Sequence, residues 1–308
     1  MPYYLGIDGG GTKTTCALGD ESQVLATSVA GPSNIVRVGA AQARESLLAA
    51  VRQACAAAGI PLEQVARTCV GGSGAARPEL AAAVRGFLAE AVSTPIDVVG
   101  DMEIAMEAAF DSGPGMIVIA GTGSIAYGRN DRGQTARAGG WGFAIGDEGS
   151  AHWIGRETVR AVLRASDKNE ERVASSPLTA ALFQAWGVRS ISDLARAANS
   201  IPPPDFAELF PAIQASGEEI AKGVFARAGR ELAALATVVL ARLFHDEKGW
   251  VRVRLTGSVF RYASQVGSVF YDELHQREPR IDVNLQVVDP VEGALKMARR
   301  AHAAGSQT

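Results

Sequence analysis

A glycine-rich turn near the N-terminus has the composition of a phosphate-binding loop. It consists of Gly9, Gly10, Gly11, Thr12 and Lys13. Glycine lets successive backbone N–H groups converge on an anion without interference from a Cβ. Asp8, directly before the turn, offers the hard oxygen that Mg²⁺ prefers, either directly or through a bound water. A P-loop is excluded because Thr12, and not a lysine, follows Gly11. The alternative is a tight hairpin without a ligand, which needs fewer glycines.

A second turn of the same kind follows the apolar residues 117–120. It consists of Gly121, Thr122, Gly123 and Ser124. Together with Ala126 this turn matches the dinucleotide-binding fingerprint, but that fingerprint requires a helix after the glycines. Residues 125–129 alternate in polarity and run into another turn, which predicts a strand instead. We therefore interpret the two turns as phosphate-binding loops, one in each half of the chain, that hold a nucleotide between the halves.

A third glycine turn follows the predicted strand 251–256 and contains Gly257 and Ser258. Glycine at this position would let the backbone approach a nucleoside closely. The alternative is a plain strand-to-helix turn in which Ser258 caps the next helix.

Asp101 is the best-placed general base in the sequence. It follows the apolar strand predicted at 96–99. If this strand runs parallel to the one that ends at Asp8, both carboxylates lie at the sheet edge where α/β proteins bind their ligands. A phosphoryl acceptor needs an acidic residue to take its hydroxyl proton, and Asp101 can serve as that residue. The alternative is that Asp101 only caps the helix that begins at Met102.

The glycine-rich segment 139–150 is suited to binding a polyol. Its candidate sugar contacts are Gly140, Trp141, Gly142 and Asp147. The glycines expose backbone groups, Trp141 offers a flat apolar wall, and the carboxylates of Asp147 and Glu148 accept hydrogen bonds from hydroxyls. The alternative for Asp147 is a cap on the helix that follows. We interpret His152 as a residue on the face of that helix and not as a catalyst.

The elements that must position these residues form two similar series. The first contains strands at 3–8, 14–19 and 24–30, a helix at 40–58, a strand at 67–71, a helix at 78–92, a strand at 96–99 and a helix at 102–110. The second contains strands at 116–120, 125–129 and 134–137, a helix at 149–165, a strand at 251–256, a helix at 262–275, a strand at 283–288 and a helix at 291–303. A mostly helical stretch at 177–244, broken at 201–204, interrupts the second series. The sequence therefore predicts a duplicated α/β fold, βββαβαβα in each half, with a helical insert in the second.

The length of 308 residues corresponds to two domains at about 150 residues each. We expect one domain at 1–112 with the closing helix 289–304, and the other at 113–288 with its insert at about 166–245. The formal net charge of −3 and the lack of a Lys or Arg run argue against a nucleic-acid partner. Because no apolar run approaches the roughly 18 residues of a spanning helix, we expect no membrane association.

The three cysteines, Cys16, Cys55 and Cys69, indicate a reducing compartment. Their number is odd, and none lies in a CxxC motif or at a metal-ligand spacing from a histidine. We therefore expect a cytoplasmic protein without metal-thiolate chemistry, and we expect it to form a homodimer.

Several of these motifs together resemble the N-acetylglucosamine kinases of the BadF/BadG ATPase family. They are GIDGGGTKT at 6–14, Ser33-Asn34, Gly100-Asp101, GTGS at 121–124 and GGWGFAIGDEGSAHWIG at 139–155. That family belongs to the superfamily of actin, hexokinase and heat-shock ATPases, whose ribonuclease H-like halves have the element order predicted above. The resemblance implies ATP as cosubstrate with Mg²⁺, and Thr12 and Thr122 as ATP contacts. It also implies that Asn34, Asp101, 140–142 and Asp147 hold the aminosugar, and that Asp101 takes the proton of the sugar 6-hydroxyl.

Two alternatives to this function stay open. The substrate could be glucosamine, because the residues around the sugar C2 are not identified by the motifs. The protein could also be a non-kinase ATPase, since activators of 2-hydroxyacyl-CoA dehydratases resemble the same family. Those activators use cysteines to bridge two subunits through an iron-sulfur cluster. Cys16 in a predicted strand and Cys55 in a predicted helix are not placed for that task.

Overall fold

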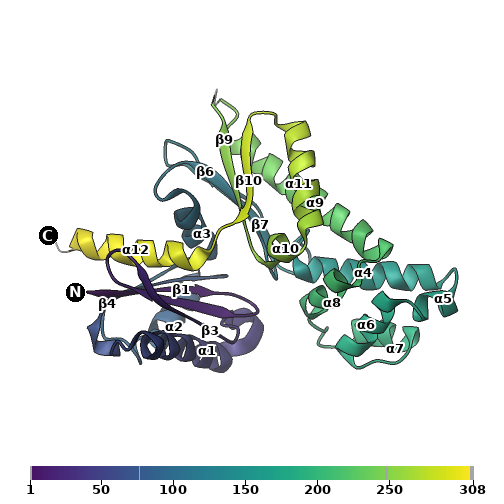
Figure 1. The fold of residues 1–308 in the computed structure, drawn as a ribbon, viewed down its shortest axis with the longest axis horizontal. Helices are drawn as coiled ribbons and strands as arrows, with labels where there is room; N and C mark the ends of the chain where they lie inside the picture. The colour runs from purple at the N-terminus through teal and green to yellow at the C-terminus, as the bar shows by residue number, and fades with distance from the viewer. Residues whose placement is uncertain (1, 76, 247–248, 306–308) are drawn as a thin grey trace. The chain divides into compact units, whose positions relative to one another are not determined.

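The computed structural model describes residues 2–75, 77–246 and 249–305. The chain forms two compact units (Figure 1). The first runs to Ile117 and resumes at Val288, and the second comprises Val118–Val287. The second unit is thus inserted into the first, before the last helix of the chain.

The first unit is built on a five-stranded sheet with the order β3-β2-β1-β4-β5. Its strands are β1 (Tyr3–Gly9), β2 (Thr14–Gly19), β3 (Val24–Ala30), β4 (Val65–Gly72) and β5 (Ile96–Gly100). β2 is antiparallel to both β1 and β3, whereas β4 pairs in parallel with both β1 and β5. The carboxyl ends of β1, β4 and β5 therefore lie at one edge of the sheet.

Helices cover both faces of this sheet (Figure 1). They are α1 (Ile35–Ala58), α2 (Pro78–Leu88), α3 (Asp101–Phe110) and α12 (Pro290–Gly305), and the short η1 (Leu62–Gln64) precedes β4. Leu5 and Ile7 of β1 belong to the core beneath α1 and α2, and the intervening Gly6 faces α12. A Cβ on Gly6 would lie 2.3 Å from the backbone nitrogen of Leu295. Successive side chains of β1 point to opposite faces of the sheet, so they pack into two separate cores, one beneath α1 and α2 and the other beneath α12.

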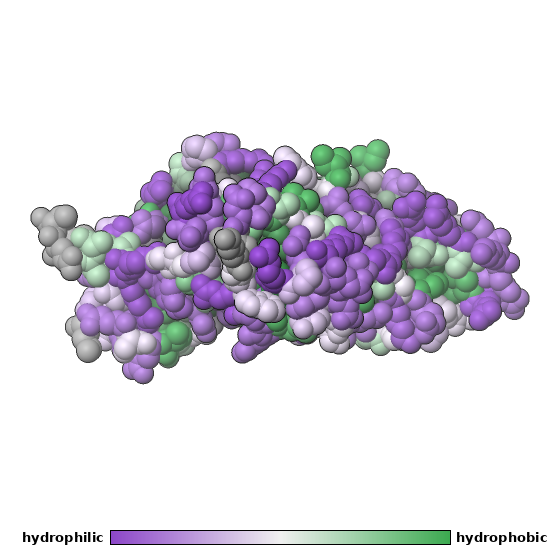
Figure 2. Space-filling model, turned by 90° about the horizontal axis from the view of Figure 1, so that it is seen from above, coloured by the Kyte–Doolittle hydropathy of each residue, from purple (hydrophilic) through white to green (hydrophobic). Residues whose placement is uncertain are grey.

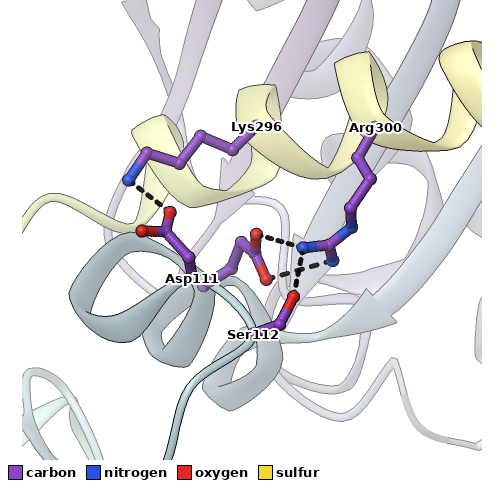
Figure 3. Close-up of polar contacts among 5 residues, drawn as sticks. Asp111, Ser112, Lys296 and Arg300 are labelled. Carbon is purple, nitrogen blue, oxygen red and sulfur yellow. Dashed lines mark hydrogen bonds and ion pairs between the residues drawn. The ribbon is translucent and has the colours of Figure 1, made fainter.

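The last helix is fixed to α3 by close packing and by charge (Figure 3). A Cβ on Gly293 would lie 1.9 Å from the carbonyl oxygen of Ile104, so only glycine allows the two helices to approach this closely. Arg300 donates to both carboxylate oxygens of Glu107, a side chain on α3 that is almost fully buried. Lys296 pairs with Asp111 at 2.9 Å. These contacts make α12 part of the first unit.

The second unit contains a sheet with the order β10-β9-β6-β7-β8. Its strands are β6 (Gly115–Ala120), β7 (Ser124–Arg129), β8 (Thr135–Gly139), β9 (Val251–Thr256) and β10 (Ile281–Val287). Read from β8 to β10, this order repeats that of the first sheet. The prediction of a duplicated α/β fold is therefore confirmed.

A helical insert separates β8 from β9. It begins with α4 (Ala151–Ser166), continues through α5 (Glu170–Ala174), α6 (Pro177–Trp186), α7 (Ile191–Ala198), η2 (Phe206–Leu209) and α8 (Phe210–Ser216), and ends with α9 (Glu219–Leu243). The predicted break at 201–204 lies between α7 and η2. In the described part of the chain, none of the helices is long and apolar enough to cross a bilayer. The face seen in Figure 2 is mostly hydrophilic, with separate apolar patches.

Three helix boundaries differ from the sequence expectation. Helix α1 begins at Ile35 and not near residue 40, because Asn34 caps it and Gly39 continues it through a kink with φ of 78°. Helix α2 ends at Leu88 instead of extending to residue 92. The helix expected at 262–275 is α11 (Ser264–Arg277), and a short helix that was not expected, α10 (Ser258–Tyr262), precedes it.

Candidate active site

Asp8 and Asp101 lie at the same edge of the first sheet, as the sequence predicted. Asp8 is near the end of β1, and Asp101 follows the last residue of β5. β4 lies between the two strands and pairs with both in parallel, with Gly71 opposite Asp8 and Gly72 opposite Gly100. The carboxylates thus emerge from two parallel strands that are separated by a single strand.

The carboxylate of Asp8 has a raised pKa. Burial is the largest cause that raises the pKa of Asp8, and the negative charges of Asp101 and Asp289 add to it. Lys13 opposes the shift, and the resulting pKa is about 7 against an ordinary value of 3.8. Asp289 stands directly before α12 and accepts a hydrogen bond from the backbone N–H of Val291 at 3.3 Å. The sequence analysis missed Asp289. An aspartate before a proline at the start of a helix is a recognisable capping signal, but it does not indicate that the helix begins beside Asp8.

Asp101 is the first residue of α3 and is held by hydrogen bonds. The backbone N–H of Met102 donates to its carboxylate at 2.9 Å, and the hydroxyl of Ser73 donates to it as well. Burial raises the pKa of Asp101 above its ordinary value, while these hydrogen bonds act in the opposite direction. The alternative of Asp101 as a helix cap is wrong. Gly100 occupies the N-cap position, and the Glu103 carboxylate accepts the Gly100 N–H at 3.1 Å.

The first glycine turn joins β1 to β2 and is tied to two neighbouring segments. The Gly10 N–H donates to the carbonyl oxygen of Lys13 at 3.0 Å, so this N–H closes the turn and does not point to a ligand. The carbonyl oxygens of Gly9 and Gly10 accept hydrogen bonds from the backbone N–H groups of Ser73 and Ser33. Thr12 and Lys13, at the tip of the turn, are exposed. The backbone N–H of Gly10 is therefore not available to a phosphate.

A small pocket lies beside this turn, next to the predicted sugar contact Asn34. Asn34 itself caps α1, because its side-chain oxygen accepts the Val36 N–H at 3.1 Å. The pocket measures about 20 Å³. Its lining consists of Gly9, Ser33, Ile35, Leu47, Val70, Gly72, Ser73, Ala75, Leu80 and Val84. Ser33 and Ser73 are the only hydroxyl-bearing residues among these, and Ser73 also bonds Asp101.

In the second unit, the turn at 121–124 and the segment at 139–150 are joined around Asp147. The Asp147 carboxylate accepts hydrogen bonds from the backbone N–H groups of Ser124 and Gly142. A Cβ on Gly123 would lie 2.9 Å from Asp147 Oδ2, and the Ser124 hydroxyl donates to the Glu148 carbonyl at 2.7 Å. Burial raises the pKa of Asp147 above its ordinary value. Asp147 therefore supports both loops.

The alternative of Asp147 as a helix cap is wrong. Ser150 caps α4, because its hydroxyl accepts the Trp153 N–H at 3.1 Å. Asp147 instead has a left-handed backbone with φ of 59°, which is uncommon for a residue with a side chain. The strain fits a residue that is held in place by its hydrogen bonds to two loops.

The tips of segment 139–150 expose large apolar side chains. Trp141 is 68% exposed and Phe143 is 50% exposed. Gly140 and Gly142, on either side of Trp141, have φ of 69° and 93°. His152 is buried on α4 and packs against the rings of Phe143 and Phe206. The interpretation of His152 as a helix-face residue is confirmed.

The third turn packs against the end of β6. Gly257 has φ of 106°, and a Cβ there would lie 2.2 Å from the carbonyl oxygen of Ala120 and 2.8 Å from the nitrogen of Gly121. The turn therefore lies directly beside the second glycine turn. Ser258 is the first residue of α10 and Gly257 occupies the N-cap position, so the alternative of Ser258 as the cap is wrong.

The donor groups at the edge of the first sheet fit Mg²⁺ better than a transition metal. Among the residues that the structure describes, no three His, Cys, Asp or Glu side chains come together as a metal site. Mg²⁺ does not need such a cage, because it keeps several waters and takes one or two carboxylates together with substrate phosphates. Asp8 can serve as such a carboxylate.

The cysteines are unsuited to metal binding. All three are buried and free. Burial raises the pKa of Cys16, raises that of Cys55 to about 11, and raises that of Cys69 to about 12. Thiols in this state are protonated and inaccessible at neutral pH.

Comparison with known proteins finds matches over nearly the whole chain. The sequence profile described as the BadF/BadG/BcrA/BcrD ATPase family matches residues 5–298. An N-acetylmuramic acid/N-acetylglucosamine kinase of Clostridium acetobutylicum is 30% identical over 97% of this chain and 99% of its own length. The crystal structure of a candidate N-acetylglucosamine kinase from Chromobacterium violaceum superposes with a TM-score of 0.74 at 26% identity, covering 96% of this chain and 99% of that one. A ROK family glucokinase from Streptomyces griseus shares the fold with a TM-score of 0.61 at 16% identity, covering 97% and 99% of the two chains.

Proposed function

Because the chain belongs to the BadF/BadG/BcrA/BcrD ATPase family, we propose that it is an ATP-dependent kinase for the 6-hydroxyl of N-acetylglucosamine. The observation that carries this proposal is the placement of Asp8 and Asp101 at the sheet edge where the parallel strands β1, β4 and β5 end, beside a glycine turn. The Clostridium acetobutylicum relative, similar over nearly its whole length, supports an aminosugar as the acceptor.

Asp101 is the proposed general base. Its carboxylate accepts the proton of the sugar 6-hydroxyl while the oxygen attacks the γ-phosphorus of ATP. Efficient proton transfer requires a pKa near the working pH, and burial moves the pKa of Asp101 in that direction. The Ser73 hydroxyl and the Met102 N–H hold the carboxylate in one orientation.

The nucleotide is proposed to bind through the three glycine turns. These contacts are Gly9, Gly10, Gly11, Thr12, Lys13, Gly121, Thr122, Gly123, Ser124, Gly257 and Ser258. Gly10 contributes through the shape of the turn, since its own N–H is engaged by Lys13. Asp8 is the proposed Mg²⁺ carboxylate, directly or through water. When bound, Mg²⁺ would offset the negative charge of the phosphates.

The sugar is proposed to contact Asn34, Asp101, Gly140, Trp141, Gly142 and Asp147. Asp147 also accepts two backbone hydrogen bonds, so it would present its remaining lone pairs to the sugar hydroxyls. Trp141 is exposed and stacks with Arg137, whose guanidinium lies 5.0 Å from the centre of the Trp141 ring. An exposed aromatic face of this kind suits the apolar side of a sugar ring.

The direct test is a coupled kinase assay with MgATP and a panel of hexoses and aminosugars. The panel includes glucosamine, and it includes N-acetylmuramic acid because the name of the Clostridium acetobutylicum relative contains it. Nuclear magnetic resonance of the product identifies the phosphorylated hydroxyl. Turnover of N-acetylglucosamine to its 6-phosphate supports the proposal. ATP hydrolysis that does not respond to any sugar contradicts it.

A dehydratase activator is a weaker candidate. Such an activator needs cysteines at its surface to share an iron-sulfur cluster with a partner subunit. Cys16, Cys55 and Cys69 are at most 3% exposed, and burial raises the pKa of each. The cysteine chemistry therefore favours the kinase.

The proposal extends to organisation and location. We propose that the two compact units correspond to two domains, predicted from the sequence as 1–112 with 289–304 and as 113–288. We also propose that the protein forms a homodimer and that it is located in the cytoplasm. Size-exclusion chromatography with light scattering measures the oligomeric state, and a monomeric mass would contradict the dimer.

A further inference from the structure

We propose that His152 of α4 is a positioning residue for the sugar. Its ring joins Phe143, which follows the proposed sugar contact Gly142, to Phe206 of η2 in the helical insert. The inference rests on the proposed function, because it makes the binding of the aminosugar depend on packing inside the insert. All of these residues belong to the second unit.

The ring of His152 packs against two phenylalanine rings from different segments of the chain. Its centre lies 5.1 Å from that of Phe143, in the segment 139–150, and 5.4 Å from that of Phe206, in η2. Both distances lie within the range of roughly 4.5–7 Å at which aromatic rings attract one another. Trp186 of α6 packs on Phe206 in turn, with 5.1 Å between the ring centres. A continuous series of ring contacts therefore leads from the segment 139–150 to the outer helices of the insert.

The short helix η2 is fixed closely to α4. A Cβ on Gly155 of α4 would lie 2.0 Å from the carbonyl oxygen of Phe206, so only glycine allows this approach. Asp205 caps η2, because its Oδ1 accepts the Ala207 N–H at 3.0 Å. The same oxygen lies 3.6 Å from Nδ1 of His152, close enough for an ion pair when the imidazole is protonated. The ring of His152 is thus held from the side of the insert by a capped and tightly packed segment.

The segment 139–150 requires contacts of this kind because its own backbone is permissive. Gly142 has φ of 93°, a conformation that glycine reaches readily but with a large loss of conformational entropy on folding. Two side chains of α4 hold Phe143, since His152 contacts its ring and Arg156 donates to its carbonyl oxygen at 3.4 Å. A segment that is ordered before the ligand arrives avoids this entropy cost at the moment of binding. His152 therefore contributes to sugar affinity through Phe143.

The first test removes single rings from this series and measures kcat and both KM values with MgATP and N-acetylglucosamine. The stabilisation of one aromatic pair corresponds to about 2- to 12-fold in affinity. His152→Ala and Phe206→Ala are each expected to raise the sugar KM by about 3- to 10-fold, with kcat and the KM for ATP within about 2-fold of the wild type. His152→Phe keeps a ring at this position, and it is expected to restore the sugar KM to within about 2-fold of the wild type.

A combined variant tests whether Phe206 acts through Phe143. Substitutions at independent sites have additive effects on free energy, so their effects on KM multiply. Once Phe143→Ala has removed the end of the ring series, addition of Phe206→Ala is expected to change the sugar KM no further. A merely structural role of Phe206 would instead lower the folded fraction and leave the KM of the folded enzyme unchanged.

Phe210→Ala is the matched control within the insert. Phe210 of α8 is 5% exposed and Phe206 is 7% exposed, and the Phe210 ring also makes an edge contact, with Phe225 at 6.3 Å. Both alanine variants lose a buried ring and are expected to lower Tm, but only Phe206→Ala is expected to raise the sugar KM. Phe206→Leu removes the ring and keeps most of the volume, so it replaces Phe206→Ala if that variant does not fold.

Hydrogen exchange of the ligand-free protein, measured by mass spectrometry, gives a readout that does not depend on turnover. Peptides from the segment 139–150 are expected to exchange faster in Phe206→Ala than in the wild type or in Phe210→Ala, because the segment loses a contact that orders it. Exchange of this segment that is equal in all three proteins would overturn the positioning role.

The kinetic outcomes separate this inference from the proposed function. Sugar KM values of Phe206→Ala and His152→Ala that equal the wild-type value would overturn the positioning role and leave the kinase intact. A further rise in KM when Phe206→Ala is added to Phe143→Ala would do the same. If the wild-type protein phosphorylates none of the sugars, the proposed function fails, and the role of His152 in sugar binding fails with it.

Discussion

Arg300 of α12 holds the buried carboxylate of Glu107 on α3 through two hydrogen bonds of 2.6 and 3.1 Å. The same helix α3 begins at Asp101, and the same helix α12 begins directly after Asp289. The ion pair therefore ties together the two helices whose N-terminal ends bring negative charge to Asp8.

Removal of this arginine is expected to destabilise the protein. Arg300→Ala leaves the Glu107 carboxylate buried without its partner, which we expect to cost about 2 kcal/mol, less than for a fully buried pair because the Arg300 side chain is 52% exposed. Lys296→Ala is the matched control on the same helix. Its ion pair with Asp111 is largely exposed, so we expect a loss below about 1 kcal/mol. Urea unfolding of both variants measures the difference, and equal losses would contradict it.

Asp101→Asn is expected to lower kcat by about 10²- to 10⁴-fold, because an amide cannot take the hydroxyl proton. The KM values for sugar and ATP should change much less. Glu103→Gln is the control, since glutamine can still accept the Gly100 N–H and keep the cap of α3. Steady-state kinetics of both variants test the assignment. Turnover of Asp101→Asn above a tenth of the wild-type value would refute the role as a base.

Asp8 is expected to make the ligand-free protein less stable as the pH rises. Its pKa is about 7 in the folded protein against an ordinary value of 3.8, so the folded state binds the proton more tightly. The free energy of unfolding should therefore fall between about pH 4 and pH 7. Asp8→Asn removes this dependence and should stabilise the protein at pH 8 by roughly 1–2 kcal/mol, after allowance for solvent screening, with no gain at pH 4.

Melting curves without magnesium and nucleotide, recorded at pH 4 and pH 8, test this prediction. Asp20→Asn serves as the control. Backbone hydrogen bonds from Gln23 and Ser22 lower the pKa of the exposed Asp20 to about 2, so its replacement should not raise Tm at pH 8. A Tm of Asp8→Asn that equals the wild-type value at both pH values would show that Asp8 is solvated in the folded protein.

Asp147→Ala is expected to weaken both the sugar and the nucleotide interactions. The variant leaves the backbone N–H groups of Ser124 and Gly142 without their acceptor, at a cost of about 1–3 kcal/mol, and so loosens both loops. Glu148→Ala, at the neighbouring position, should have a smaller effect. Calorimetric titration with N-acetylglucosamine and with an ATP analogue, alongside melting curves, measures these effects. Loss of sugar affinity alone, with Tm unchanged, would show that Asp147 acts only on the sugar.

The sequence by itself determined the fold and the residues that end its strands. Three features of the sequence are local patterns: the two-residue period of β1, the glycines after β1 and β6, and the repeated order of strands and helices. Such patterns can be read from the sequence because neighbouring residues determine the local backbone geometry. The positions of Asp8, Asp101 and the glycine turns could be predicted for this reason. The start of α1 could not, because Gly39 interrupts the helical pattern while Asn34 caps the helix upstream of it.

Only the tertiary structure decided which of these residues act on one another. Asp289 raises the pKa of Asp8 although the two lie at opposite ends of the chain, and Ser73 bonds Asp101 from a different strand end. Asp147, a candidate sugar contact by sequence, proved to accept hydrogen bonds from two loops. Charge interactions, hydrogen bonds and pocket shape depend on distances through space between segments that are far apart in the sequence, and no local pattern of residue types contains those distances.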